Sequence, residues 1–63
     1  MARYKVLKDF QWGKMYLTRS TIITINEQSN DLSVVSLQNS EDTQIVGTKA
    51  VEGMVLLEKI EKY

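Results

Sequence analysis

The side chains of this chain that are best suited to binding chemistry lie close together, in the stretch RYKVLKDFQWGKMY at residues 3–16. This stretch contains four of the five aromatic residues and four of the eight basic residues. In proteins that bind single-stranded nucleic acid, aromatic rings stack on the bases while Lys and Arg contact the phosphates. The stretch therefore predicts a candidate nucleic-acid-binding site, which comprises Arg3, Tyr4, Lys5, Lys8, Trp12, Lys14 and Tyr16.

A protein partner is the alternative, and the position of Trp12 favours it. Trp12 follows the polar Gln11 and precedes Gly13, so we expect its side chain to be exposed in a loop. Exposed Trp side chains often anchor protein interfaces, and nearby cations select an acidic partner. The predicted partner-binding site comprises Trp12, Phe10, Lys8, Lys14 and Arg19. Aromatic side chains are also needed to fill a small core, and the sequence leaves Tyr4 and Tyr16 undecided between core and surface.

The charged residues are unevenly distributed, although the net charge is zero. Residues 1–19 contain five basic residues and one acidic residue (+4), whereas residues 20–46 contain four acidic residues and no basic residue (−4). Such a separation of charge can bring copies of a protein together. The sequence pI of about 6.1 is also far below that of most nucleic-acid-binding domains. A protein partner, including a second copy of this chain, is therefore favoured over nucleic acid.

The composition argues against catalysis. The chain has no His and no Cys, which removes the commonest general base and the strongest nucleophile. Its glycines are isolated and form no phosphate-binding loop, and Glu27, Asn30 and Asp31 lack the spacing of a calcium-binding loop. The adjacent Glu41 and Asp42 are expected at a solvated turn. We therefore predict a non-enzymatic protein with no catalytic residue, cofactor, metal ion or small-molecule substrate.

The sequence also predicts a cytoplasmic protein with no membrane partner. Its longest apolar run, MVLL at residues 54–57, is too short to span a bilayer. The stretch MARYKVLKDF contains charges and no small-residue cleavage site, unlike a signal peptide. The absence of Cys agrees with a reducing compartment.

Strand patterns dominate the chain. RYKVLK alternates like a half-buried strand, and KMYLT, STIITIN, LSVVSLQ and TQIVG are further strand candidates. Turn residues at 26–31 and 39–42 separate the last three strands, so residues 20–47 are predicted to form a three-stranded antiparallel meander. In residues 48–63 a helix would have apolar side chains on all sides and would contain Gly53. We therefore expect a short helical turn near residues 48–52 and then a strand, GMVLLEKIE.

These elements predict a single all-β domain over residues 1–63, in which five short antiparallel strands curl into a small barrel. Their order resembles an SH3-like barrel over essentially the whole chain. The segments that carry this resemblance are VLKDF (opening strand and long first loop), KMYLTRSTIITI (diverging turn and second strand), NSED (distal hairpin) and TKAVEGMVLL (helical turn and last strand). The opening YKVLKDF…GKMY also resembles small phage-encoded proteins of unknown role, which implies a phage or mobile-element origin.

The chain departs from the SH3 domains that bind proline-rich ligands. Residues 17–62 contain none of the aromatic residues that form their binding groove, and Arg19-Ser20 replaces the usual Gly-Asp pair of the diverging turn. The resemblance therefore implies an SH3-like shape without proline-ligand binding. Because the chain has no Pro, we expect STIITI and GMVLLEKI to be able to extend a sheet into another copy. The predicted function is a self-associating protein-interaction or assembly module, and the alternative is a small barrel that binds single-stranded nucleic acid.

Overall fold

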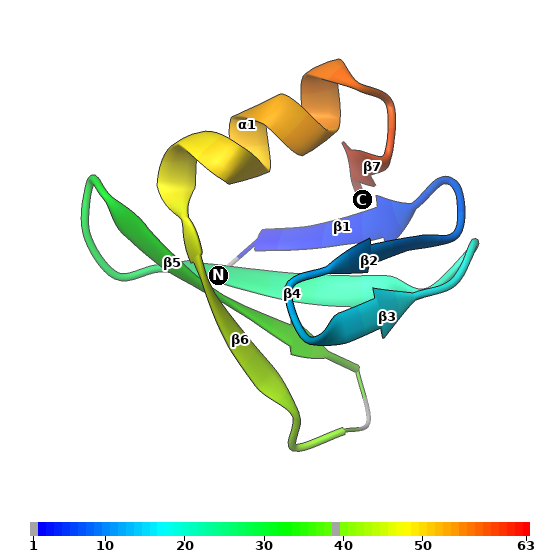
Figure 1. Ribbon diagram of the computed structural model, residues 1–63, viewed down its shortest axis with the longest axis horizontal. Coiled ribbons are helices and arrows are strands. Elements are labelled where there is room, and N and C mark those ends of the chain that lie inside the picture. Colours follow the sequence, from blue (N-terminus) through cyan, green and yellow to red (C-terminus); the bar gives the residue numbers. More distant parts are fainter. Residues whose placement is uncertain (1, 39) are drawn as a thin grey trace.

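The computed structural model describes residues 2–38 and 40–63. The main element of the fold is a five-stranded antiparallel sheet with the strand order β6-β5-β4-β1-β7 (Figure 1). Its strands are β1 (Ala2–Val6), β4 (Ile22–Glu27), β5 (Leu32–Leu37), β6 (Thr43–Gly47) and β7 (Ile60–Lys62). Two further strands, β2 (Phe10–Trp12) and β3 (Met15–Leu17), form a separate hairpin, and one helix, α1 (Thr48–Leu56), connects β6 to β7. The prediction of an all-β fold is confirmed only in its coarser form, because the chain is mostly β but also contains the nine-residue helix α1.

The middle of the sheet follows the alternation in the sequence. In β4 the buried side chains are Ile23 and Ile25, and in β5 they are Ser33 and Val35. Ile25 lies opposite Val35 in the antiparallel β4–β5 ladder, and β6 pairs with the other side of β5. The predicted three-stranded meander over residues 20–47 is therefore confirmed.

Hydroxyl side chains stabilise the turns of the meander. In the β4–β5 turn, the Ser29 Oγ accepts hydrogen bonds from the backbone N–H of Asp31 (3.2 Å) and Leu32 (3.1 Å). After β5, the Ser40 Oγ accepts a bond from the Asp42 N–H (3.1 Å). These contacts explain why short polar residues suit both turns. Residue 39, within the predicted NSED turn, lies outside the described residues.

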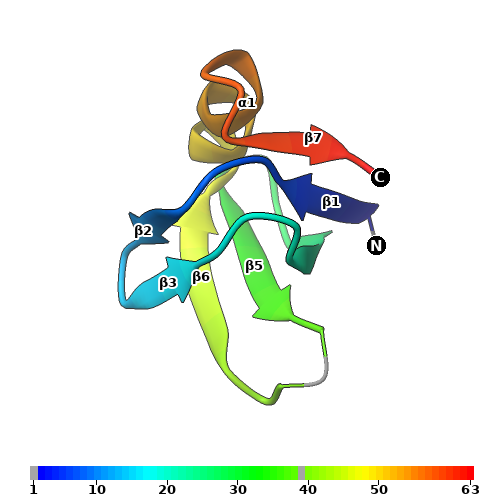
Figure 2. The same cartoon turned by 90° about the vertical axis from the view of Figure 1, so that its right-hand side faces the viewer.

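The first and last strands lie side by side, which brings the two ends of the chain together (Figure 2). β1 pairs with β4 on one side and with β7 on the other. The Tyr63 N–H extends the β1–β7 ladder by donating to the Arg3 carbonyl (2.9 Å). Within the described residues no ladder joins β6 to β7, so the sheet does not close into a barrel; α1 contacts both strands instead.

The C-terminal third differs from the expectation. The predicted strand at residues 53–61 is wrong, because α1 continues to Leu56 and β7 begins only at Ile60. Ala50, Val51 and Met54 pack on the core and form a narrow apolar stripe. Val55, Leu56 and Leu57 are exposed, so their scatter around the helical wheel concealed the stripe.

The end of α1 has the hydrogen bonds of a Schellman motif. The Glu58 N–H donates to the Val55 carbonyl (3.0 Å), and the Lys59 N–H donates to the Met54 carbonyl (3.0 Å). Glu58 has a left-handed backbone with φ 59°, the position that Gly usually occupies in this motif. This turn reverses the chain and allows β7 to return beside β1.

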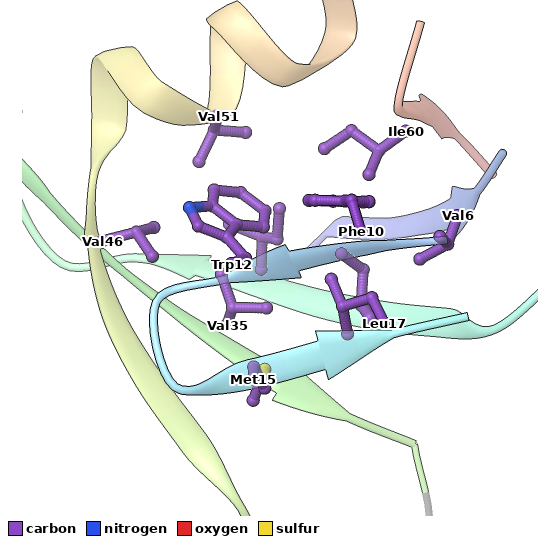
Figure 3. Close-up of a cluster of buried hydrophobic side chains, with 11 residues drawn as sticks. Val6, Phe10, Trp12, Met15, Leu17, Val35, Val46, Val51 and Ile60 are labelled. Atoms are coloured by element: carbon purple, nitrogen blue, oxygen red, sulfur yellow. The ribbon is translucent and has the colours of Figure 1, made fainter. Parts of the chain in front are cut away.

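The core lies between the sheet, the β2–β3 hairpin and α1 (Figure 3). Every element of the chain contributes to it, which explains how so short a chain can form one continuous core. The buried hydrophobic residues are Val6, Phe10, Trp12, Met15, Leu17, Ile23, Ile25, Val35, Val46, Val51 and Ile60.

Candidate interaction surfaces

Trp12 is a core residue. It lies in β2 with 7% of its surface exposed, and its indole ring points toward Val46 and Val51 (Figure 3). The expectation of an exposed loop Trp is therefore wrong. The reason is the hairpin, in which Phe10 and Trp12 face inward while Gln11 between them faces solvent.

Phe10, the second aromatic residue of the predicted partner-binding site, is buried as well. Its ring lies 6.1 Å from the Trp12 ring, centroid to centroid. The Lys59 Nζ lies over the Phe10 ring, 5.3 Å from its centroid and within cation–π range. Neither ring is therefore presented to a partner, and the exposed aromatic anchor on which that predicted site rests is missing.

The cations of the predicted partner-binding site do not form one cluster. Lys8, Lys14 and Arg19 are all exposed. The turn of Arg19 is bound to the loop of Lys8, because the Arg19 N–H donates to the Asp9 carboxylate (2.7 Å) and the Ser20 N–H donates to the Val6 carbonyl (2.8 Å). Lys14 lies at the tip of the β2–β3 hairpin, at the other end of that hairpin (Figure 1).

The aromatic residues of the candidate nucleic-acid site are also separated. Tyr4 is half-buried and packs on the core, whereas Tyr16 is 63% exposed on the outer side of β3. With Trp12 buried, Tyr16 is the one ring of that predicted site that is largely exposed. Arg3 is exposed on β1, where the ladder brings it beside Tyr63, a 72% exposed aromatic residue that the sequence did not point to.

Two groups of aliphatic side chains remain exposed. The first, which we call the β5–β6 patch, consists of Leu32 (51% exposed), Val34 (half-buried) and Ile45 (66% exposed). Val34 and Ile45 are directly opposite each other in the β5–β6 ladder. By strand alternation, all three lie on the outer face of the sheet, away from the core.

The second group, which we call the α1 patch, lies at the end of the helix and consists of Val55, Leu56 and Leu57. Leu56 is 83% exposed, the largest exposure among the large hydrophobic residues that the structure describes. Contiguous exposed aliphatic residues are uncommon on small monomeric proteins and often mark interaction sites.

The free edges of the sheet are not the expected ones. STIITI cannot extend the sheet, because β4 is paired with β1 on one side and with β5 on the other. The first half of GMVLLEKI belongs to α1, and Ile60 is its one residue in a strand. The edge strands are β6, whose sequence TQIVG contains no charge, and β7, where two of three residues are charged. Charges and Pro are common protection against edge-to-edge pairing, so β6 is the less protected edge.

Two shallow grooves lie elsewhere on the surface. A groove of about 400 Å³ at the start of α1 contains the Ser33 and Thr48 hydroxyls. These hydroxyls bond each other (2.8 Å), and the Thr48 hydroxyl donates to the Ser29 carbonyl (3.2 Å), so both are engaged within the protein. The second groove, about 420 Å³, lies between Tyr16 of β3 and Thr43 of β6.

Neither a metal cluster nor a membrane-spanning helix is found in residues 2–38 and 40–63. No group of three or more His, Cys, Asp and Glu residues is arranged to hold a metal ion there. No helix in the same residues is long and apolar enough to cross a membrane.

No protein-family model, curated protein or solved structure matches this chain.

Proposed function

We propose that this chain is a non-enzymatic interaction module that assembles with other copies of itself. The observation that carries this proposal is the exposure of large aliphatic side chains on so small a domain, in the β5–β6 patch and the α1 patch. Removing apolar surface from water is favourable by about 25 cal/mol per Å². A chain of 63 residues has little core to spare, so association that covers either patch also stabilises the fold by mass action.

The distribution of charge supports self-association. Arg19 and Lys8 lie before β4, at one end of the strand, and Glu27 and Asp31 lie at or beyond its other end (Figure 1). Glu41 and Asp42 follow the end of β5. That end lies beside the start of β4, because the Gln38 N–H donates to the Ile22 carbonyl. Lys49 follows Thr48, whose N–H donates to the Asp31 carbonyl. Each end of the sheet therefore carries charges of both signs. Opposite charges on separate copies attract each other and increase the rate of encounter.

The strand order supports an SH3-like shape as part of the same proposal. β7 lies beside β1, the β4–β5–β6 meander follows, and a helix precedes the last strand. The β2–β3 hairpin occupies the position of the long first loop in this arrangement. A phage or mobile-element origin and a cytoplasmic location remain predictions from the sequence.

Binding of single-stranded nucleic acid remains the alternative prediction. Stacking sites for successive bases need several neighbouring rings. Here Trp12 is buried and Tyr4 is half-buried, so Tyr16 and Lys14 would have to bind the bases and phosphates without these two rings. Self-association has the better support.

Sedimentation equilibrium over a wide range of protein concentration tests the proposal. We expect the average molar mass to rise above that of the 7.3 kDa monomer and to be unchanged by a labelled single-stranded oligonucleotide. A monomer at every concentration would contradict self-association. A monomer that binds the oligonucleotide, and binds it less tightly at high salt because counterions are released from the phosphates, would support the alternative.

A further inference from the structure

The free edge of β6 offers a regular set of backbone hydrogen-bonding groups. At the end of β6 the Thr48 N–H donates to the Asp31 carbonyl across the β5–β6 ladder (2.9 Å). Alternate residues of an antiparallel strand bond to the same neighbour. Val46 and Gln44 therefore bond to β5 as Thr48 does, and the N–H and C=O groups of the residues between them are directed away from the sheet. These outward residues are Thr43, Ile45 and Gly47.

We propose that two copies of this chain join through β6, in antiparallel orientation, about a twofold axis at Ile45. The outward residues are evenly spaced on both sides of Ile45, so Ile45 pairs with Ile45 of the second copy and Thr43 pairs with Gly47 of the second copy. Each pair exchanges two backbone hydrogen bonds, and the two sheets become one continuous sheet. The inference rests on the proposed self-association and specifies the interface.

The β5–β6 patch lies on the face that this pairing brings together. Directly opposite residues in a ladder have their side chains on the same face of the sheet. The two Ile45 side chains therefore contact each other on the outer face, and each has Val34 beside it on β5. The most exposed side chain of the patch, Ile45 at 66%, becomes the centre of the interface.

The charges beside β6 favour the antiparallel orientation. Glu41 and Asp42 precede the strand and Lys49 follows it. Antiparallel pairing places the two carboxylates near Lys49 of the second copy, whereas parallel pairing would place them beside their own equivalents. Lys14 lines a groove with Asp42 of its own copy, and Asp31 lies one strand further from the interface, so Lys49 is the cation that the second copy brings to this corner.

The other free edge, β7, does not fit β6 in the same way. The Leu7 N–H donates to the Lys59 carbonyl and the Tyr63 N–H donates to the Arg3 carbonyl, which assigns Lys59, Glu61 and Tyr63 to the side that faces β1. The outward residues of β7 are then Ile60 and Lys62, and Ile60 faces the core with 1% exposure. A β6–β7 pair would join the outer face of one copy to the core face of the next.

Disulfide trapping tests the pairing register, because the chain has no Cys of its own. Hydrogen-bonded antiparallel partners have Cα atoms about 5.5 Å apart, within the range that a disulfide spans. We expect Ile45→Cys to form a covalent dimer on mild oxidation. Leu56→Cys, on the α1 patch, is the matched exposed control and should not cross-link faster than by random collision. A mixture of Thr43→Cys and Gly47→Cys should cross-link to each other rather than to themselves.

Sedimentation equilibrium of charged variants tests the contribution of the patch. We expect Ile45→Lys to weaken dimerisation by at least about tenfold, whereas Leu56→Lys leaves it unchanged. Lys49→Glu should weaken it as well, more strongly at low salt, because the corner loses its cation. Since Ile45 and Leu56 are both exposed, the melting temperatures of Ile45→Lys and Leu56→Lys should be close to each other when both are measured at a protein concentration low enough for monomers.

The outcomes separate this inference from the proposed function. If the natural chain dimerises but Ile45→Lys has no effect, or Leu56→Cys cross-links in place of Ile45→Cys, the β6 interface is wrong and self-association stands. Open-ended oligomers in place of dimers would also overturn the twofold arrangement. If the natural chain is a monomer at every concentration, both proposals fail.

Discussion

Phe10 and Trp12 project from the same side of β2, and their ring centroids lie 6.1 Å apart with the ring planes tilted by 37°. Together they fill the space between the sheet and α1, with Val51 and Ile60 above them (Figure 3). The β2–β3 hairpin thus closes the core from the side that the five-stranded sheet leaves open. Phe10 and Trp12, two of the aromatic residues that the composition associates with binding, are therefore structural in this fold.

Replacing Trp12 should therefore cause the chain to unfold. Truncating a buried Trp to Ala costs about 3–5 kcal/mol, and a domain of this length is expected to have a total stability of only about 3–9 kcal/mol. We expect Trp12→Ala to lower the urea midpoint severely or to abolish cooperative unfolding, as followed by circular dichroism. Tyr16→Ala is the matched control on the partner strand of the hairpin, where 63% exposure predicts a change within about 0.5 kcal/mol. Equal stability of the two variants would contradict the core assignment of Trp12.

Gly13 should resist substitution for two separate reasons. Its backbone is left-handed, with φ 63°, and an added Cβ would clash with the side-chain amide of Gln44. We expect Gly13→Ala to destabilise the fold by at least about 1 kcal/mol, and Gln44→Ala in the same chain to recover part of the loss. Gly53 is the contrasting site, since it lies within α1 and has open space around it. Gly53→Ala should stabilise the chain by about 1 kcal/mol, and a stabilising Gly13→Ala would show that the turn geometry is different.

Glu58→Gly should make the chain more stable. Glu58 occupies the left-handed position that ends α1, with φ 59°, and a non-glycine residue there costs about 1 kcal/mol. We expect a gain of that size in the free energy of unfolding from urea titration. Glu52→Gly, at an exposed position inside α1, should instead lose about 1 kcal/mol. Two losses of equal size would mean that Glu58 does not adopt the left-handed conformation.

The strands with regular alternation could be predicted from the sequence. In β4 the buried Ile23 and Ile25 alternate with Thr24, and in β5 the buried Val35 lies between the less buried Val34 and Ser36. Short polar residues mark the turn between these two strands. The helix could not be predicted as easily. Its core-facing stripe is narrow, and Leu56 and Leu57 next to it are exposed, so the segment lacks the contrast between faces that identifies an amphipathic helix.

The sequence contains a pattern that predicts a buried Trp12, although the adjacent Gln11 and Gly13 favour an exposed loop. Apolar residues alternate on both sides of Gly13-Lys14, with Phe10 and Trp12 before and Met15 and Leu17 after, which is the pattern of a two-residue hairpin. In such a hairpin, Trp12 lies on the same face as Phe10, which is the face toward the core.

The β5–β6 patch could not be found from the sequence alone. Ile45 sits in an ordinary strand pattern, and its exposure follows from β6 being an edge. Which strand lies at the edge depends on the return of β7 to β1, a contact between opposite ends of the chain that no local pattern encodes.

The central claim is that this chain assembles with itself, and its most direct test is the molar mass of the natural chain measured by sedimentation equilibrium beside Ile45→Lys and Leu56→Lys. We expect the natural chain and Leu56→Lys to form dimers as the protein concentration rises, while Ile45→Lys remains a folded monomer over the same range. A natural chain that stays at 7.3 kDa at every concentration would contradict the claim.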